Sequence, residues 1–157
     1  MSHESHQPRI VVGVDGSPAS VAALRWAVRQ AELTGATLGA VTAWHYPTVL
    51  GGYAWAPVAA MESQNLQESA EKTAAGVVAA AVDPATDVPI RILAPEGSPA
   101  RVLLGAADGA DLLVVGGSGH GSLAGALLGS VSRHCAQHAP GTVAVIRGTR
   151  RVVQAPA

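Results

Sequence analysis

Two apolar runs in this chain are each followed closely by the same tripeptide, Gly-Ser-Pro. Residues 9–15 lead into it at 16–18, and residues 88–94 lead into it at 97–99. Serine is a preferred helix N-cap and proline fits the first helical position, so each junction predicts a strand that passes into a helix. A chain in which strands and helices alternate folds as an α/β protein around a parallel sheet.

The other elements follow from hydrophobic spacing and from turn residues. We expect strands at 9–15, 36–43, 88–94, 111–116 and 142–147, and helices at 18–34, 60–82, 99–107 and 130–139. The β-branched run at 9–15 is typical of a central strand covered on both faces. These elements predict one open, five-stranded parallel sheet with helices on both faces. Residues 1–8 are expected to be a disordered tail and 149–157 a flexible one, which leaves 9–148 as the single domain.

Composition excludes several classes of partner and compartment. The net charge is −1, and the arginines are scattered, so we expect neither nucleic acid nor a membrane surface as a partner. Asp108 and Asp111 interrupt the longest apolar stretch, which keeps it below the ~18 residues that span a bilayer. A single cysteine, Cys135, excludes an internal disulfide, and we find no secretory signal pattern. The expected location is therefore the cytoplasm.

The stretch at residues 114–139 carries the strongest functional signal. It holds six glycines between Gly116 and Gly129, directly after an expected strand and before an expected helix. Backbone amides can converge on a phosphate where no Cβ intervenes, so glycines suit such a loop. Residues 129–132 would add amides, two hydroxyls and the positive end of the helix dipole. The pattern predicts an anion site, although a glycine loop can also serve only to let a helix pack closely on a sheet.

Asp15 lies at the carboxyl end of the first expected strand, just before a helix, where open α/β sheets bind ligands. Asp-Gly is also a common turn dipeptide, so a purely structural role is the alternative. A carboxylate beside a phosphate would repel it, unless the carboxylate faces ribose hydroxyls or holds a divalent cation. We therefore treat Asp15 as a ribose or Mg2+ contact.

Two common phosphate motifs are absent. A Walker A loop needs a Gly-Lys pair, and the only lysine is Lys72; a Rossmann fingerprint fails because residue 122 is serine. The spacing that is present, Gly116, two residues, Gly119, nine residues and Gly129-Ser130, resembles the nucleotide-binding signature of the universal stress protein family. IVVGVDGSPAS near the start and HAPGTVAVIR near the end match the family as well, so the resemblance covers roughly residues 9–148.

This resemblance implies a Rossmann-like sheet, similar to the adenine nucleotide α-hydrolase fold, with strand order 3-2-1-4-5. It implies ATP or another adenine nucleotide as the ligand, with Mg2+ at Asp15 and the adenine near Ala43. It also implies a homodimer through the fifth strand, 142–147. The implied nucleotide-binding residues are Gly13, Val14, Asp15, Ala43, Gly116, Gly117, Gly119, His120, Gly129, Ser130, Val131 and Ser132.

The expected function is that of an ATP-binding stress or regulatory protein that acts through nucleotide-dependent conformation or assembly. Ser118 stands where relatives frequently have arginine, which leaves Arg133 or Mg2+ to balance the phosphates, so we expect slow hydrolysis at most. Three alternatives stay open. They are a dimeric interaction module without nucleotide, an ATP-cleaving enzyme, and a flavodoxin-like flavin carrier. The sequence lacks two features expected of the enzyme, the SGGxDS loop of ATP pyrophosphatases and a general-base histidine with an obvious orienting carboxylate.

Two further features have open interpretations. The aromatic loop at 44–57 is either a lid or partner surface, or a satellite cluster that covers the sheet. His134 and His138 share a helix face and have the spacing of a metal pair, but the sequence shows no third ligand.

Overall fold

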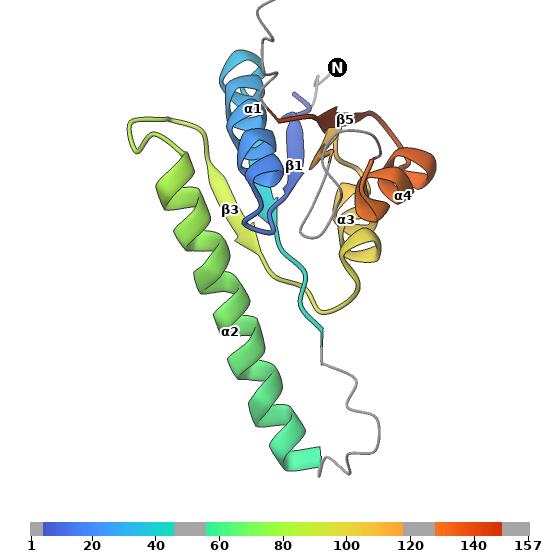
Figure 1. Ribbon diagram of the computed structural model, residues 1–157. Coiled ribbons are helices and arrows are strands. Elements are labelled where there is room, and N and C mark those ends of the chain that lie inside the picture. The colour runs from blue at the N-terminus through green and yellow to red at the C-terminus, as the bar shows by residue number, and fades with distance from the viewer. Residues whose placement is uncertain (1–4, 46–55, 118–127, 149–157) are drawn as a thin grey trace, which may run out of the picture.

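The computed structural model describes residues 5–45, 56–117 and 128–148, without the side chains of 56–63 (Figure 1). Every predicted strand and helix is present. The elements are β1 (Arg9–Gly13), α1 (Pro18–Thr34), β2 (Thr37–Val41), α2 (Ala56–Ala81), β3 (Ile90–Leu93), α3 (Pro99–Ala107), β4 (Leu112–Gly116), α4 (Ser130–His138) and β5 (Val143–Ile146). The alternation inferred from the two Gly-Ser-Pro junctions therefore runs through the described chain.

The five strands form one sheet in the order β3-β2-β1-β4-β5, and all pairs are parallel. This confirms the predicted fold class and strand order. β1 lies in the centre, with Gly13 opposite Val41 of β2 and Val12 opposite Val114 of β4. The carboxyl ends of β1 and β4 are thus neighbours. We call the edge of the sheet where the strands end the carboxyl edge, and the opposite one the amino edge.

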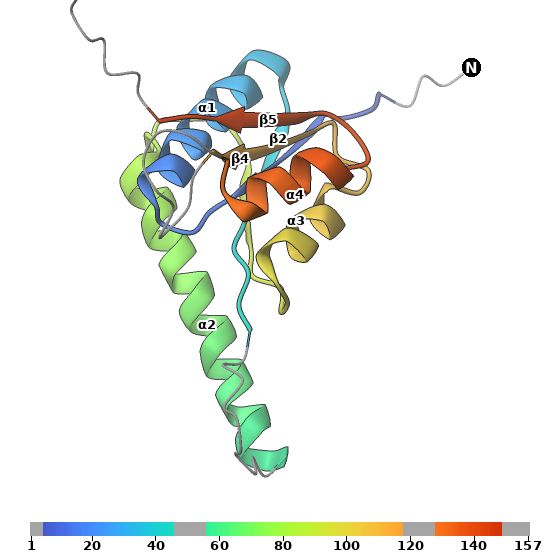
Figure 2. The ribbon, with the colours of Figure 1, turned by 45° about the vertical axis from the view of Figure 1, so that its right-hand side comes forward.

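Helices cover both faces of the sheet, as predicted (Figure 2). On one face α1 and α2 pack over a core that includes Val12, Leu24 and Leu38. On the other face α3 and α4 pack over a core that includes Val11, Leu103 and Leu113. Consecutive β1 residues contribute to opposite cores because side chains alternate along a strand. This is why the strand reads as an unbroken apolar run.

The two Gly-Ser-Pro junctions both start helices, but they do so differently. At α1 the Ser17 side chain accepts a hydrogen bond from the Ser20 amide at 3.2 Å, as an N-cap does. Ser98, at the corresponding place before α3, is exposed and makes no side-chain capping bond in the structure. There the first helical bond, from the Val102 amide to the Ser98 carbonyl at 3.0 Å, follows a proline at the first helical position.

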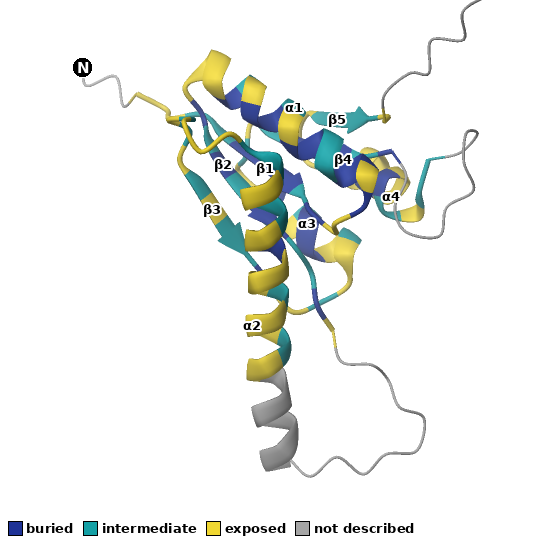
Figure 3. Ribbon diagram, turned by 60° about the vertical axis from the view of Figure 1, so that its left-hand side comes forward, coloured by how far each residue is buried: buried dark blue, intermediate teal, exposed yellow. Residues whose placement is uncertain are grey.

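Helix α2 is longer than the sequence analysis indicates. It starts at residue 56 instead of 60 and projects beyond the sheet (Figure 1). Near its carboxyl end Ala74 is buried and Val77 and Val78 pack against the core, whereas the face turned away from the sheet is exposed (Figure 3). None of the helices in the described ranges has the length and apolar character needed to cross a bilayer.

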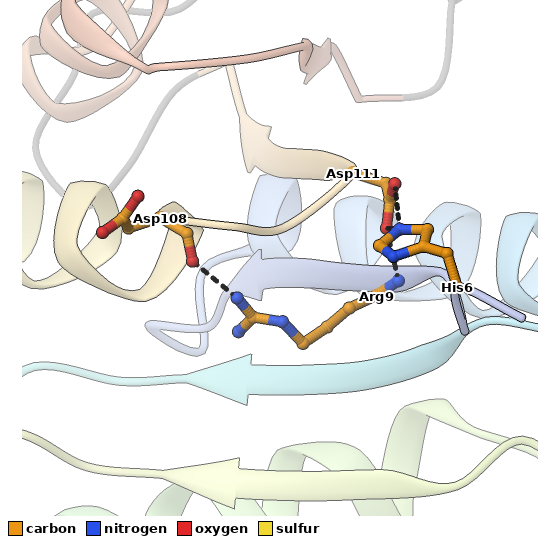
Figure 4. Close-up of polar contacts among 4 residues, drawn as sticks. All are labelled: His6, Arg9, Asp108 and Asp111. Carbon is orange, nitrogen blue, oxygen red and sulfur yellow. Dashed lines mark hydrogen bonds and ion pairs between the residues drawn. The ribbon is translucent and has the colours of Figure 1, made fainter. Parts of the chain in front are cut away.

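The amino edge is held by charged groups (Figure 4). The Asp111 carboxylate accepts the Arg9 amide at 2.8 Å and pairs with His6 Nε2 at 2.8 Å. The Arg9 guanidinium donates to the carbonyls of Asp108 at 2.6 Å and Ala106 at 3.2 Å, at the end of α3. A cation there also suits the negative end of the helix dipole. His6 belongs to the segment expected to be a disordered tail, and residues 1–4 lie outside the described residues.

Candidate functional site at the carboxyl edge

The carboxyl edge between β1 and β4 is the topological switch point of the sheet. β1 has β2 on one side and β4 on the other, and α1 and α3 lie on opposite faces. In open α/β sheets ligands bind in the crevice that such an arrangement leaves outside the strand ends. Figure 2 shows the start of α1 and the start of α4 converging on this edge.

Asp15 lies in the turn between β1 and α1 at this edge. Its Oδ1 accepts the Ser17 amide at 2.8 Å, and its own amide donates to Ser20 Oγ at 3.3 Å. Gly16 between them has φ of +80°, a conformation that favours glycine. The carboxylate is therefore a turn former, as one interpretation of the sequence predicted, and it is also exposed at the switch point.

Gly116, at the end of β4, lies against the first turn of α1. A Cβ at this residue would be 2.8 Å from the carbonyl carbon and 2.9 Å from the carbonyl oxygen of Ala19. Backbone atoms cannot be moved aside as a flexible side chain can, so only glycine fits here. The close approach of a helix to the sheet explains this glycine.

Gly117 connects three segments through its backbone. Its amide donates to the Ile146 carbonyl at 2.8 Å, and its carbonyl accepts the Gly129 amide at 2.8 Å. Ser132 Oγ donates to the same carbonyl at 3.4 Å. These bonds commit the Gly117 amide to the sheet and fix the start of α4 beside the end of β4.

The amino terminus of α4 presents the backbone donors of the site. The first bond within this helix runs from the Arg133 amide to the Gly129 carbonyl at 3.0 Å. The amides of residues 130–132 precede that bond and have no acceptor within the helix, so they form the positive end of its dipole. Ser130 is exposed. Ser132 is only 2% exposed, and its hydroxyl donates to the Gly129 carbonyl at 3.0 Å.

Three further residues of the predicted nucleotide site, Gly13, Val14 and Ala43, have structural partners. A Cβ at Gly13 would lie 3.0 Å from Leu103 Cδ1, and Val14 is 4% exposed with its amide bonded to the Val41 carbonyl at 2.8 Å. Ala43 is partly buried against the core under α3 and α4. Gly13 and Ala43 thus face the core under α3 and α4, and Val14 belongs to the core under α1 and α2.

Trp44 is a residue that the sequence analysis misplaced in a loop. It is 9% exposed, and its indole Nε1 donates to the Ala94 carbonyl at 2.8 Å. Its backbone pairs with the segment after β3, through the bond from the Gly97 amide to the Trp44 carbonyl at 2.8 Å. Trp44 thus extends the β2–β3 pair past Ala43. The other aromatic residues of this stretch, Tyr46, Tyr53 and Trp55, lie outside the described residues.

Arg147 is a cation near the site that the sequence analysis missed. It follows β5, and β5 pairs with β4 so that Gly116 is opposite Ile146. A Cβ at Gly117 would lie 3.3 Å from Arg147 Cγ. Both Arg147 and Arg133 are exposed. Gly119 and His120, together with Ser118, lie outside the described residues, so their predicted roles stay predictions.

Other reactive groups lie away from this edge. In the described ranges no group of three or more His, Cys, Asp and Glu side chains is arranged to hold a metal ion. Cys135 is fully buried, and this burial raises the pKa of its thiol. An open groove of about 340 Å³ lies between α2 and β3, lined by Glu68, Glu71, Lys72, Ala75 and Ile92, and is not part of the switch point.

These observations define a doubly wound α/β protein with a carboxylate and a helix amino terminus at its switch point. The sequence model of the universal stress protein family matches residues 8–147, and the chain belongs to this family. The resemblance stated from the glycine spacing is thereby confirmed.

Several family members resemble this chain closely. Universal stress protein Rv1996 of Mycobacterium tuberculosis is 37% identical over 144 residues, which cover 90% of this chain and 44% of that protein. A universal stress protein of Mycolicibacterium smegmatis is 35% identical, covering 88% of this chain and 48% of that protein. The chain thus spans about half the length of the curated relatives it matches.

Solved structures show the same fold. Universal stress protein UspA from Lactobacillus plantarum superposes with a TM-score of 0.67 at 26% identity, covering 89% of this chain and 97% of that one. A universal stress protein crystallised in complex with cAMP superposes with a TM-score of 0.58 at 33% identity, covering 88% and 95%.

Proposed function

We propose that this protein binds an adenine nucleotide at its carboxyl edge and acts as a stress-response regulator. The observation that carries the proposal is the placement of Asp15 and the amino terminus of α4 at one switch point, although they are far apart in the sequence. Family membership supports it, as does the relative of 33% identity that binds cAMP.

The residues divide by the chemistry they offer. The amides of 130–132 and the Ser130 hydroxyl would bind phosphate oxygens, because they are donors at the positive end of a helix. Gly13, Val14 and Ala43 would contact the nucleoside part of the ligand. Gly119 and His120 would complete the phosphate contacts, and Gly116 and Gly117 would hold the backbone that carries them.

Asp15 would contact the ribose hydroxyls or a Mg2+ ion that the nucleotide brings with it. Mg2+ is commonly held by one or two carboxylates together with substrate phosphates. The Asp15 carboxylate is exposed and is held in place by the Ser17 amide. A single carboxylate suits a Mg2+ ion that is also bound by nucleotide phosphates better than a metal site made of protein ligands alone. Arg147 and Arg133 would supply the positive charge that Ser118 does not, which favours ATP over AMP.

The site favours binding over turnover. Rapid phosphoryl transfer needs a positioned base or nucleophile in addition to donors. Among the described residues, His6 forms an ion pair with the Asp111 carboxylate. This pair lies at the amino edge, across the sheet from Asp15. We propose at most slow hydrolysis, with the nucleotide acting on conformation or assembly.

Assembly would use the fifth strand, expected at 142–147 and present as β5, as the interface of a homodimer. β5 is an edge strand of the sheet, and its four residues Val143–Ile146 are apolar and only partly buried. An apolar edge needs a cover, and pairing with a second copy about a two-fold axis provides one. Light scattering at micromolar concentration should give the mass of a dimer. The free thiol of Cys135 fits a reducing compartment, for which we propose the cytoplasm.

Mass spectrometry of the small molecules released from freshly purified, denatured protein tests the ligand class directly. We expect an adenine nucleotide. Calorimetric titration of ligand-free protein with ATP, ADP, AMP and cAMP, each with and without Mg2+, then ranks the ligands. Absence of binding by all four nucleotides would contradict the proposal and leave an interaction module without nucleotide.

A further inference from the structure

The two histidines of α4 lie side by side on its surface, with His134 in the middle of the helix, one turn after Ser130, and His138 at its last residue. We propose that His134 and His138 form a chelate for a divalent transition-metal ion, Cu2+ above Ni2+ and Zn2+. Both side chains are exposed, and neither histidine is among the residues of the candidate nucleotide site. This proposal is independent of the proposed nucleotide site.

The two rings are near enough for one ion to bridge them. Residues four apart in a helix are neighbours on one face. The two imidazole rings lie with their centroids 4.3 Å apart and their planes 26° from parallel. Stacked rings direct their in-plane lone pairs alongside each other, so the His134 ring must rotate for both rings to bind one ion.

The hydrogen bonding of His138 sets which nitrogen can bind metal. Its Nδ1 is 3.0 Å from the His134 carbonyl oxygen. A carbonyl oxygen only accepts, so Nδ1 must carry the hydrogen, and the lone pair of the neutral ring is on Nε2. Metal-binding histidines commonly donate their other ring nitrogen to a carbonyl in this way, which fixes the ring and raises its basicity. His138 is thus oriented as a ligand.

Charge at this end of the helix favours a cation. His138 is the last residue of α4, and the carbonyls of a final helical turn carry partial negative charge. Cys135 lies between the two histidines in sequence but is fully buried, so it is not a third ligand. Water would complete the coordination sphere. With two imidazoles, affinity follows the general order that places Cu2+ first.

Calorimetric titration of the full chain, without an affinity tag, with CuCl2 in a weakly coordinating buffer tests the proposal. We expect one ion per chain for the wild type and loss of measurable binding for His134→Ala and for His138→Ala. Saturating Cu2+ should also raise the thermal midpoint of the wild type and not that of either variant, since an ion that binds only the folded state stabilises it.

Two controls make the result specific. The double variant Ala136→His with His138→Ala keeps two histidines on α4 but places them about 200° apart around the helix, and we expect it not to bind. His6→Ala removes the other exposed histidine that has a possible ligand beside it, Asp111, and we expect wild-type binding. Binding that survives the shifted pair, is lost only with His6→Ala, or is absent from the wild type would overturn the proposal. Circular dichroism confirms that each variant is folded.

Discussion

Gly116 and Ala19 bring β4 and α1 into contact at the place where the proposed ligand site begins. A Cβ at Gly116 would lie 2.8 Å from the backbone carbonyl carbon of Ala19, closer than Cβ atoms approach other atoms in proteins. Ala19 belongs to the first turn of α1, just after Asp15 and Gly16. The packing of this glycine therefore positions the Asp15 turn relative to the end of β4.

Gly116→Ala should destabilise the protein by about 1–3 kcal/mol, the usual cost of overpacking a tight contact. It should also weaken nucleotide binding, because α1 must move away from β4 and carry the Asp15 turn with it. Chemical denaturation measures the first effect and calorimetric titration the second. An unchanged free energy of unfolding would contradict the contact.

Gly76→Ala is the matched control for this substitution. Gly76 lies inside α2, and a Cβ there would meet nothing within 4 Å. Alanine has less backbone freedom to lose than glycine, so this variant should be more stable by roughly 0.5–1 kcal/mol. Nucleotide affinity should not change, because the added methyl group displaces no neighbouring atom.

The fold was predictable because local signals agreed along the chain. Capping serine and proline marked the start of α1, Gly35 marked its end with φ of +70°, and the β-branched run marked a doubly covered β1. The strand order came from the family resemblance and not from these signals. The early start of α2 was missed, because an alanine-rich segment after an aromatic loop offers no capping residue to mark it.

The site was predictable only in part. Asp15 and the amino terminus of α4 could be predicted as candidate site residues. Asp15 lies between a strand and a helix, and Ser130 opens a helix. The sequence could not show that Gly116 is required by Ala19, since a glycine needed for packing and one needed for a ligand look alike. Arg147 was missed because its closeness to Gly117 depends on the pairing of β4 with β5.

Ser130→Pro isolates the contribution of one backbone amide at the start of α4. Proline is tolerated at the first helical position, and Gly129 before it, with φ −59° and ψ 160°, already has the extended conformation that proline demands of its neighbour. Affinity for ATP should fall about tenfold, since a hydrogen bond to a charged group is lost. Ser130→Ala, which removes only the hydroxyl, should have a smaller effect in the same titration. Equal affinities for all three proteins would remove this helix end from the site.

Asp15→Asn separates the two roles of the carboxylate. Asparagine keeps an oxygen that can accept the Ser17 amide, so the turn and the stability should persist, but the charge that would attract Mg2+ is gone. The gain in ATP affinity on adding Mg2+ should therefore disappear. Asp15→Ala should lose about 1 kcal/mol of stability as well, because the amide loses its acceptor. A wild-type response to Mg2+ in the Asn variant would contradict the Mg2+ role, and an unchanged ATP affinity without Mg2+ would contradict the ribose contact as well.

Asp111 should give the amino edge a measurable pH dependence. The hydrogen bond from the Arg9 amide, and then His6, lower the pKa of this carboxyl below its ordinary value. A group with a lowered folded-state pKa stabilises the protein above its unfolded pKa, and this contribution is lost as the pH falls through the folded pKa. The stability difference between the wild type and Asp111→Asn should thus be present at about pH 5 and shrink as the pH falls further. Urea denaturation across this range measures it, and a difference that grows with acidity would contradict the assignment.

Arg147→Ala tests whether the cation beside Gly117 contributes to phosphate binding. Arg147 is exposed, so its interaction with a phosphate is weakened by water and salt, and we expect about a fivefold loss of ATP affinity, the size of an exposed charge pair. The loss should be smaller for AMP, which carries less charge, and should decrease as the salt concentration rises. Arg91→Ala is the control, because Arg91 is an equally exposed arginine on β3, at the opposite side of the sheet. If both variants lose affinity alike, the effect comes from the net charge of the protein. If Arg147→Ala alone loses it, the end of β5 belongs to the nucleotide site, and a dimer formed through β5 would bring the sites of the two subunits close to their shared interface.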